Sequence, residues 1–489
     1  MSVRVLSVVS EAVPLVKTGG LADVAGALPG AVAPHGVAMT TLIPGYPAVL
    51  ASTGKVRAVH AWDSLLGAPA RLLATKPGEH PLLVLDAPGL FDRPGSPYGD
   101  ALGKDWADNW RRYAALGRAA ADLVGGAVKS RQFDLLHAHD WQAAMAPAYQ
   151  RFAPLAKARA VPSVMTIHNM AFQGHFGREI FNQLGLPRIA FAIDGVEYHK
   201  GVGFLKAGMV SASAITTVSP TYAAEIRDPE FGMGLEGLVE GRGDRVFGIV
   251  NGIDTAEWNP ATDPALAANY TARTLAKRGA NKRALEAEFG LIESARGDGG
   301  PLFIVVGRLT WQKGMDVLLE VLDHLVGMGG SLALLGSGDA AMEEAFRAAA
   351  ARHPGRVGVR IGYDEALSHR MQGGGDAILV PSRFEPCGLT QLYGLAYGCV
   401  PVVARTGGLA DTVIDANIAA MAMGAGTGIQ FDGIHYRGLA NAITRTVELY
   451  RQPQAWRAIQ RAGMKSDFSW SQSGKAYADL YARLLAEAA

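Results

Sequence analysis

The stretch LFIVVGRLTWQKGMDVLLEVLDHLVGMGGSLALLG, residues 302–336, decides the fold. It opens with an apolar run at 302–306, passes through a polar loop into a helical pattern at 315–326, and ends in a second apolar run at 331–335. Short buried runs joined by an amphipathic helix are typical of a parallel β-α-β unit. The same alternation continues in a helix at 340–352, a strand at 377–380, a helix at 389–397 and a strand at 400–404. This half of the chain is therefore predicted to be a doubly wound α/β domain.

The first half of the chain shows the same alternation. Apolar runs at 3–9, 132–139 and 161–167 predict buried strands, and residues 21–32 predict a helix. The segment 251–264 is dense in turn-forming residues and separates the two halves. The predicted fold class is thus α/β, with two Rossmann-like doubly wound domains.

The predicted domain boundaries follow from these patterns. An N-terminal domain is expected at 1–256 and a C-terminal domain at 257–465, followed by a terminal helix within 466–489. Apolar residues recur there at helical spacing, at Tyr477, Leu480, Tyr481, Leu484 and Leu485.

Composition excludes several classes of protein. The 489 residues contain 46 Lys+Arg and 45 Asp+Glu, giving a net charge of +1, so a general nucleic-acid binder is not expected. Cys387 and Cys399 are the only cysteines, which excludes a disulfide framework and favours a reducing cytoplasm. No apolar run approaches the roughly 18 residues of a membrane span. We expect no secretory leader, because Ser7, Ser10 and Glu11 interrupt the N-terminal apolar stretch.

Two similar segments each precede a predicted helix. Lys17-Thr-Gly-Gly-Leu-Ala-Asp-Val near the N-terminus recurs as Arg405-Thr-Gly-Gly-Leu-Ala-Asp-Thr. Glycines allow a ligand to approach the backbone closely, and the first N–H groups of a helix attract anions. The first segment could therefore form an anion site, but on this motif alone a tight turn with a solvated lysine is favoured.

Two further segments favour anion binding in the second half. Arg308 and Lys313 share one loop between a strand and a helix, and two cations there suit a diphosphate. Glu385 stands just before a helix that Gly388 opens, where free N–H groups could receive phosphate or sugar hydroxyls. The alternatives are exposed surface cations for the first pair and a helix-capping carboxylate for Glu385.

The segment Gly336-Ser-Gly338-Asp-Ala-Ala suggests a rival function. It fits the dinucleotide fingerprint of an NAD-dependent oxidoreductase. The expected acidic residue about 20 positions further on is missing, since Asp364 lies 28 residues beyond Gly336. A helix-opening glycine turn is therefore favoured. No Gly-x-Ser-x-Gly or Walker segment occurs, which argues against a serine hydrolase and a P-loop NTPase.

Histidines gather at the ends of two predicted strands, in His137-Ala-His139-Asp140-Trp and in Thr166-Ile-His168-Asn169. The His-x-His spacing puts two imidazoles on one face of a strand, so a metal has to be considered. No third ligand stands at a recognisable metal spacing, and no Asp-x-Asp pair could hold Mg²⁺ against a diphosphate. Hydrogen-bonding or sugar-positioning roles are therefore favoured over a metal site, with purely structural histidines as the other alternative.

Six segments, in the same order along the chain, resemble those of bacterial glycogen synthases and plant starch synthases. They are Lys17–Val24, His137–Trp141, Thr166–Asn169, Val250–Pro260, Gly307–Gly314 and Glu385–Gly394. The resemblance implies the GT-B architecture, with the active site in the cleft between two domains and the C-terminal helix returning to the N-terminal domain. It also implies retaining transfer of glucose from ADP-glucose to the non-reducing end of an α-1,4-glucan, in the cytoplasm, without metal or cofactor.

Roles for individual residues follow from the resemblance alone. The implied catalytic residues are His168, Asp140, Arg308, Lys313 and Glu385. The implied substrate-binding residues are Lys17, Gly19, Gly20, Asn251, Tyr363, Cys387, Gly388, Leu389 and Thr390, with Tyr363 as the candidate to stack on adenine. The acceptor-side candidates are Glu11, Tyr98 and Asn169.

One departure from the wider retaining-transferase pattern concerns mechanism. Those enzymes often carry a second glutamate eight residues after the first, whereas position 393 is a tyrosine here, as it is in glycogen synthases. A mechanism that needs two carboxylates at this point is therefore not expected. The alternatives that stay open are a GT-B transferase using a UDP- or GDP-sugar, the oxidoreductase, and a carbohydrate-binding protein without activity.

Overall fold

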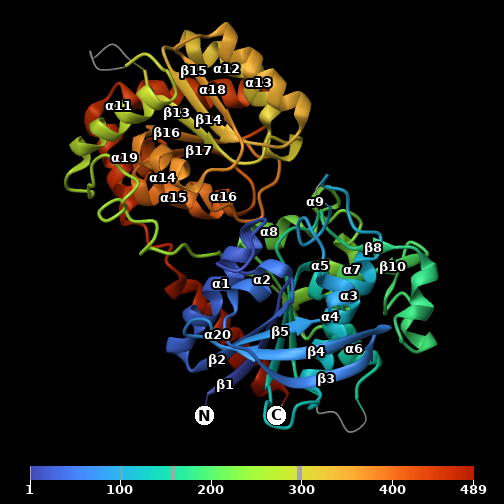
Figure 1. Ribbon diagram of the computed structural model, residues 1–489. Coiled ribbons are helices and arrows are strands. Elements are labelled where there is room, and N and C mark those ends of the chain that lie inside the picture. The colour runs from blue at the N-terminus through green and yellow to red at the C-terminus, as the bar shows by residue number, and fades with distance from the viewer. Residues whose placement is uncertain (1, 101, 156–159, 294–299, 489) are drawn as a thin grey trace. The chain divides into compact units, whose positions relative to one another are not determined.

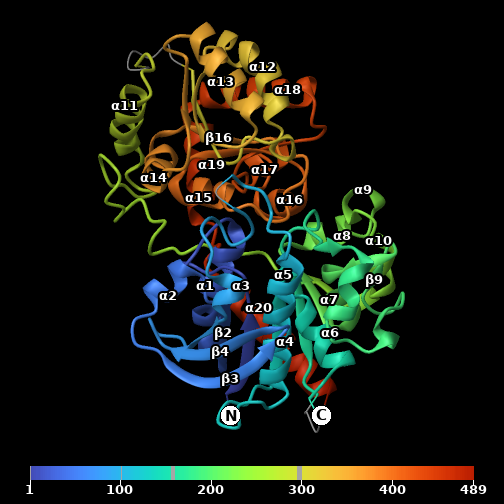
Figure 2. The same ribbon diagram turned by 45° about the vertical axis from the view of Figure 1, so that its right-hand side comes forward.

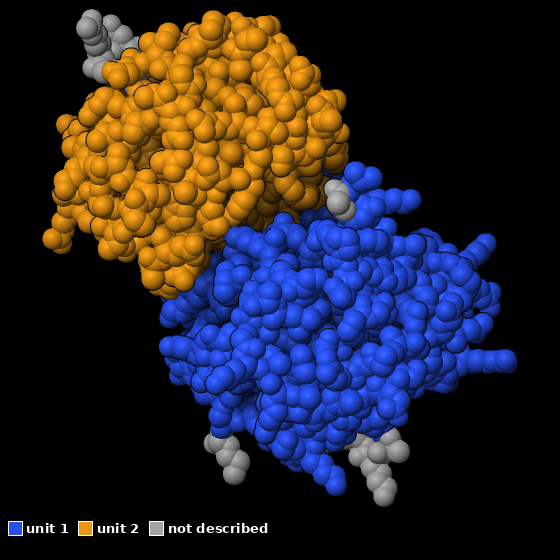
Figure 3. Space-filling model, in the orientation of Figure 1, with its two compact units in different colours: residues 1–252, 470–489 blue, residues 253–469 orange. Residues whose placement is uncertain are grey.

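The computed structural model describes residues 2–100, 102–155, 160–293 and 300–488. The chain divides into two compact units, drawn in blue and orange in Figure 3. Unit 1 comprises residues 1–252 and 470–489, and unit 2 comprises residues 253–469. The sequence placed the boundaries after 256 and 465. In the structure the boundaries fall after 252 and 469 instead. The Ile253 N–H donates to the Phe468 carbonyl at 2.8 Å, and Ile253 packs with Trp258. These contacts join both linking segments of the chain to unit 2.

Unit 1 is built on a nine-stranded sheet. Its first seven strands are parallel, and the last two join as antiparallel neighbours. The order is β12 (Val246–Gly248), β11 (Ala214–Thr217), β7 (Ser163–Ile167), β6 (Leu135–His139), β1 (Val3–Val8), β2 (Val37–Pro44), β5 (Leu82–Asp86), β4 (Ala68–Thr75) and β3 (Arg57–Leu65). A separate three-stranded sheet has the order β8 (His175–Phe176), β10 (Gly201–Gly203) and β9 (Glu197–Tyr198).

Helices cover both faces of the large sheet, because successive side chains of a buried strand point to opposite faces. In β1, Leu6 and Val8 pack in one core and Val5 in the other. The first core also holds side chains of α4 (Asn109–Val124), α5 (Asp140–Ala143), α6 (Met145–Phe152) and α7 (Phe204–Ser211). The second holds α1 (Gly20–Val32) and α20 (Trp470–Glu487), which pack on each other. The short helices are α2 (Pro47–Ser52), α3 (Pro88–Phe91), α8 (Pro220–Glu225), α9 (Pro229–Gly232) and α10 (Glu236–Gly241).

Unit 2 is built on a six-stranded parallel sheet, visible with its helices in Figures 1 and 2. The order is β15 (Val357–Ile361), β14 (Ser331–Gly336), β13 (Leu302–Val306), β16 (Ala377–Val380), β17 (Val400–Ala404) and β18 (Ile429–Phe431). Alternation again separates two cores: Phe303 packs with α12 and α18, and Ile304 with α11 and α14. The helices are α11 (Arg278–Glu288), α12 (Met315–Gly327), α13 (Ala340–Arg352), α14 (Glu365–Gly374), α15 (Thr390–Tyr397), α16 (Gly407–Thr412), α17 (Ile418–Ala422), α18 (Tyr436–Tyr450) and α19 (Pro453–Lys465).

The predicted fold class, two doubly wound α/β domains, is confirmed. Each strand and helix expected from the sequence is present within a few residues, for example β13 at 302–306 and α13 at 340–352. The antiparallel β3–β4 pair and the three-stranded sheet were not expected. Among the helices of the described residues, none is both long enough and apolar enough to cross a membrane.

Candidate active site

Glu11 organises the loop that precedes α1 in unit 1. Its buried carboxylate accepts hydrogen bonds from the Thr18 backbone N–H at 2.5 Å, from the Thr18 hydroxyl at 2.9 Å and from the Gly19 N–H at 3.3 Å. The Tyr98 hydroxyl donates to the same carboxylate at 2.7 Å. The structure thus brings together the two acceptor-side candidates Glu11 and Tyr98. Glu11 shapes the loop that contains Lys17 and Gly19.

The start of α1 leaves room for a ligand. Lys17 Nζ lies 2.8 Å from Asp23 Oδ1 in the first turn of the helix and is partly exposed. Gly19 is extended, with φ −161°, and a Cβ atom built on it meets no protein atom within 4 Å. No side chain caps the N-terminus of α1, whose first residue is Gly20. Helix N–H groups beside a lysine and an uncrowded glycine suit a negatively charged or hydroxyl-rich ligand.

Asp140 and His168 meet at the carboxyl ends of β6 and β7. The His168 N–H donates to Asp140 Oδ1 at 2.7 Å. Burial raises the pKa of Asp140 to about 7, although backbone N–H groups of His168 and Asn169 act in the opposite direction. Asp140 also adopts φ +54°, a left-handed conformation that costs a non-glycine residue free energy and is often found at functional sites. The carboxyl group is therefore poised between its neutral and ionised forms near neutral pH.

The three histidines of this region are neutral. Burial lowers the pKa of His137 and of His168 to about 3, and it lowers the pKa of His139 well below its usual value. The rings of His137 and His139 stack with centroids 4.0 Å apart, which confirms that both lie on one face of the strand. His137 bonds to the Tyr481 hydroxyl at 2.7 Å and to the Thr166 hydroxyl at 2.5 Å, so it has a structural role.

Two asparagines predicted at the site differ in their surroundings. The Asn169 carboxamide oxygen accepts from the Ala171 N–H at 3.0 Å and so closes a turn after β7. Asn251 is buried, and its Oδ1 atom has no hydrogen-bond partner within the described part of the chain. A buried polar atom without a partner is costly, and the predicted contact of Asn251 with substrate stays a prediction.

In unit 2, the predicted cations line a cavity of about 50 Å³ at the carboxyl ends of β13 and β16. Its lining includes Arg308, Lys313, Ser382 and Thr390. Arg308 is exposed, and its guanidinium lies 3.4 Å from the Gln312 side-chain oxygen. A larger hollow of about 270 Å³ in unit 2 contains none of the predicted residues. The smaller cavity is therefore the candidate site, because its charges match the predicted chemistry.

Glu385 is held in place by two neighbours. Lys313 Nζ donates to Glu385 Oε2 at 2.5 Å, and the Ser382 hydroxyl donates to the same oxygen at 2.8 Å. The Glu385 and Ser382 side chains are buried. The carboxylate is therefore fixed by two residues of the cavity lining, and Lys313 balances its charge.

The segment 387–390 leads from this carboxylate into α15. Gly388 adopts φ +74°, a conformation that favours glycine, and no side chain caps the helix before Thr390. The backbone N–H groups at Leu389 and Thr390 therefore lie at an uncapped helix start. Cys387 is buried and its carbonyl accepts from the Gln391 side chain at 3.0 Å, so its predicted contact with substrate stays a prediction.

Tyr363 follows β15 and is 74% exposed, which is unusual for a large aromatic side chain. An exposed ring beside a strand end offers a flat surface for stacking. Its predicted contact with adenine stays a prediction.

In the structure, Gly336 and Gly338 of the dinucleotide-like segment pack closely against neighbouring backbone. A Cβ atom on Gly336 would lie 2.0 Å from the Gly307 carbonyl oxygen, and one on Gly338 would lie 2.4 Å from that of Leu309. Asp339 caps α13, and the Gly338 N–H donates to Glu343 at 3.0 Å. Two carboxylates thus occupy the helix start where a dinucleotide phosphate would bind. The glycines serve close packing of the backbone, which disfavours the oxidoreductase.

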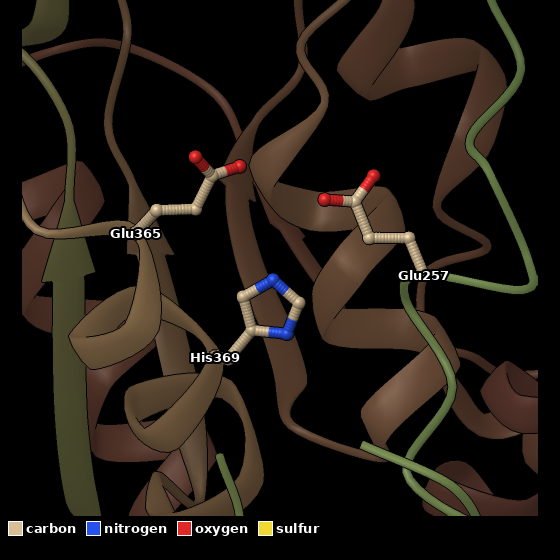
Figure 4. A group of neighbouring side chains, drawn as sticks. All are labelled: Glu257, Glu365 and His369. Atoms are coloured by element: carbon tan, nitrogen blue, oxygen red, sulfur yellow. The ribbon is translucent and has the colours of Figure 1, made fainter. Parts of the chain in front are cut away.

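One group of possible metal ligands lies elsewhere in the described residues. Glu257, Glu365 and His369 hold ligand atoms within 4.8 Å of one another, and Figure 4 shows the imidazole below the two carboxylates. The other side of the ring is bonded through Nδ1 to the buried Asp263 at 2.8 Å. Both glutamates are exposed, and exposed carboxylates often gather without an ion. The histidines that raised the question of zinc are not part of this group, and the expectation of no metal stays a prediction.

Sequence reasoning missed several residues that position the site. Arg383 binds Asp316 through two hydrogen bonds of 2.7 Å and stacks on Trp311 at 4.3 Å, which joins the Arg308 loop to the Glu385 segment. Ser382 was missed as well, although the polar segment Pro381-Ser-Arg directly after β16 was a usable signal.

Two family models match the chain. The one described as starch synthase catalytic domain matches residues 4–241. The one described as glycosyl transferases group 1 matches residues 292–462. Each unit of the structure thus contains the match to one of them.

Curated relatives and solved structures are similar over the whole chain. The chain is 74% identical over 487 residues to the glycogen synthase of Novosphingobium aromaticivorans, with 100% of both chains covered. It is 59% identical over 484 residues to that of Mesorhizobium japonicum, with 99% of both covered. The catalytic domain of starch synthase IV from Arabidopsis thaliana, bound to ADP and acarbose, superposes with a TM-score of 0.88 at 29% identity and covers 99% of this chain and 100% of that one. The chain therefore belongs to the glycogen synthase family of two-domain GT-B glycosyltransferases.

Proposed function

We propose that the chain transfers glucose from ADP-glucose to the non-reducing 4-hydroxyl of an α-1,4-glucan, with retention of configuration. Relatives named glycogen synthase and a starch synthase structure bound to ADP and acarbose support this choice of donor and acceptor. The observation that carries the proposal is the unit 2 cavity lined by Arg308 and Lys313.

The cavity suits the charge that develops during transfer. When the bond between glucose C1 and the diphosphate breaks, its electron pair stays on the phosphate oxygen. Arg308, Lys313 and the N–H groups at the start of α15 would stabilise that charge. One fixed donor of this kind contributes roughly 2.7–4 kcal/mol to transition-state stabilisation. These groups would do so without a metal or cofactor.

The carboxylates beside the cavity, among the residues that the structure describes, bear on the route by which configuration would be retained. A covalent route would need a nucleophilic carboxylate about 5 Å from a second one. Glu385 is engaged by Lys313 and Ser382, and Tyr393, at the position of the second glutamate, stacks on Trp258 with centroids 3.6 Å apart. We therefore favour attack on the same face, with the departing phosphate accepting the proton of the glucan hydroxyl.

The remaining predicted residues would bind the two substrates. His168 and Asp140 would hold hydroxyls of the transferred glucose, and Lys17 with Gly19 and Gly20 would contact the donor. The other proposed contacts are Asn251, Tyr363, Cys387, Gly388, Leu389 and Thr390 for the donor, and Glu11, Tyr98 and Asn169 on the acceptor side. Residues of both units would thus act on one substrate, which predicts that ADP compacts the chain in small-angle scattering.

The test is release of ADP on mixing ADP-glucose with glycogen, compared with release of UDP from UDP-glucose. We expect ADP release with an α-linked product, detected by NMR of the anomeric proton. The Arg308→Ala variant should lower kcat/KM by about 10²–10³-fold. Arg347→Ala, which removes an exposed arginine of α13, is the matched control. Release of UDP alone, or a β-linked product, would contradict the donor or the stereochemistry, respectively.

The proposal includes no further partner. We propose that ADP-glucose and the glucan are its substrates, in the cytoplasm, and that it uses neither nucleic acid nor membrane. The near-zero net charge supports the first exclusion.

A further inference from the structure

Three side chains form a hydrogen-bonded row across neighbouring strands of unit 1. Ser7 lies in β1, His139 ends β6, and His168 directly follows β7. Ser7 Oγ lies 3.2 Å from His139 Nε2, and His139 Nδ1 lies 3.1 Å from His168 Nε2. Ser7 and His139 are fully buried, whereas His168 is partly exposed. The row thus leads from the interior of the sheet to a residue of the proposed site.

The number of protons on these groups decides which atom is the donor in each hydrogen bond of the row. All three side chains of the row are neutral, because burial holds the pKa of both histidines far below neutral pH. A neutral imidazole carries one proton on one of its two nitrogens. If His168 Nε2 donated to His139, then His139 would donate to Ser7. The Ser7 hydroxyl proton would then lack an acceptor in the part of the chain that the structure describes.

The opposite direction gives an acceptor to both buried donors of the row, the Ser7 hydroxyl and the His139 imidazole. Ser7 donates to His139 Nε2, and His139 Nδ1–H donates to His168 Nε2. The single proton of His168 then resides on Nδ1, the nitrogen that the row does not use. A buried donor without an acceptor is destabilising, which favours this direction over the first.

We infer that Ser7 and His139 are positioning residues that hold His168 as the Nδ1–H tautomer, so that His168 acts as a neutral hydrogen-bond donor and not as a base. The inference rests on the proposed function, because it assigns the Nδ1–H group to an oxygen of the sugar substrate. Asp140 holds the backbone of His168 and His139 holds its ring, so the side chain is fixed at two points. The other histidine of the His-x-His pair, His137, bonds to Thr166 and Tyr481 and lies outside the row.

The tautomer is measured by two-bond ¹H–¹⁵N correlation spectra of the full chain labelled with ¹⁵N-histidine. The His168 signals are identified by their loss in His168→Gln. We expect the Nδ1–H pattern at pH 7.5 in the parent protein and a shift toward Nε2–H in Ser7→Ala. Thr166→Val removes a partner of His137 at similar depth and should leave the His168 pattern unchanged. An Nε2–H pattern in the parent protein would overturn the inference.

Activity supplies the second readout. We expect kcat to fall about fivefold in Ser7→Ala and about 30-fold in His139→Leu, with little change in KM for the glucan. His139→Asn places an amide N–H near the position of Nδ1 and should recover most of the loss. Equal damage in His139→Asn and His139→Leu, with an unmoved His168 pattern in Ser7→Ala, refutes the positioning role. If His139→Leu does not fold, Ser7→Ala and the parent spectrum still decide. Full activity of His168→Gln would refute the proposed role of His168 instead, since the tautomer is measured independently.

Discussion

The two segments with nearly the same sequence, 17–24 and 405–412, do different work. In the first, Gly19 has no protein atom within 4 Å of an added Cβ, and Lys17 pairs with Asp23 six residues on. In the second, Gly407 adopts φ +45°, and a Cβ on Gly408 would lie 2.3 Å from the Cys387 carbonyl oxygen. Both segments open a helix, α1 and α16.

The difference lies in what surrounds each segment. The Glu11 carboxylate accepts hydrogen bonds from the backbone of the first segment, and Gly19 stays exposed to solvent. The second segment packs against the backbone of 385–387, and the Gly408 N–H donates to the Glu385 carbonyl at 3.1 Å. Glycine thus makes room for a ligand in one copy and for the chain itself in the other. The proposed function assigns substrate contact to the first copy only, and variants at Gly408, at Lys17 with Arg405, and at Gly19 test that division.

The largest effect is expected for Gly408→Ala. The new methyl group would overlap Cys387 and push away the segment that holds Glu385. We expect the free energy of unfolding to fall by about 2–4 kcal/mol and kcat/KM to fall more than about 100-fold. Thermal unfolding should show a decrease of about 5–10 °C in Tm. An unchanged Tm would mean that the second segment does not support Glu385.

Lys17→Ala and Arg405→Ala form a matched pair at equivalent positions. Loss of a charged hydrogen bond to the donor should raise KM for ADP-glucose about 10- to 100-fold in Lys17→Ala. The Arg405 side chain makes an exposed contact of 3.5 Å with Asp432, so its loss should change KM by less than about twofold. Initial rates of ADP release measure both. Similar effects of the two variants on KM would contradict the proposal that only the first segment contacts the substrate.

The Gly19→Ala variant tests whether the space beside Gly19 is needed for ligand binding and not for folding. The extended backbone at Gly19 accepts alanine, so we expect Tm to stay within about 2 °C. The added methyl group should still reduce kcat/KM about tenfold, because it meets the bound donor. An active variant with unchanged KM would show that no ligand approaches this glycine.

The environment of Asp140 predicts a pH dependence. Its pKa of about 7 means that the carboxylate, which accepts hydrogen bonds from sugar hydroxyls most strongly, forms as the pH rises through 7. We expect kcat/KM to rise by up to about tenfold between pH 6 and pH 8, and Asp140→Asn to flatten the profile. The contribution of Asp140 to the free energy of unfolding changes with pH in the opposite direction to kcat/KM. The fold favours the protonated form, so the contribution of Asp140 to stability is complete below about pH 4 and is lost as the pH rises through 7.

Removal of metal should have the smallest effect. We expect kcat/KM to change by less than about twofold after dialysis against EDTA, because the proposed charge stabilisation uses Arg308, Lys313 and helix N–H groups. A large loss of activity that zinc restores would contradict this. The Glu257→Gln, Glu365→Gln double variant would then show whether the ligands around His369 are responsible.

The sequence predicted most of the fold because buried parallel strands are continuous apolar runs. β13 and β16 are fully or nearly fully buried, and both were expected at the observed residues. β3 was not expected, since most of its residues are at least partly exposed and their pattern shows no apolar run. Short strands such as β8 and β9 contain two residues each, too few to show any period.

The site was predictable where residues cluster in sequence. Arg308 and Lys313 share one loop, and strand-end loops of a parallel sheet are where ligands bind. The partner of His139 was not predictable in this way, because Ser7 lies 132 residues away and meets it only through the order of the strands. The same holds for Ser382 and Arg383, whose partners depend on how two loops fold over the cavity.

The return of α20 to unit 1 has a consequence for biosynthesis. Tyr477, Tyr481 and Leu484 complete the core beneath β1 and β6, and the Tyr481 hydroxyl bonds to His137. A ribosome makes these residues only after the whole of unit 2, residues 253–469. The first unit to be started is therefore the last to be finished, and a nascent chain exposes the apolar groove under α20 until translation is nearly complete. A chain broken off within unit 2 would retain that open groove, which marks it for chaperones and proteases.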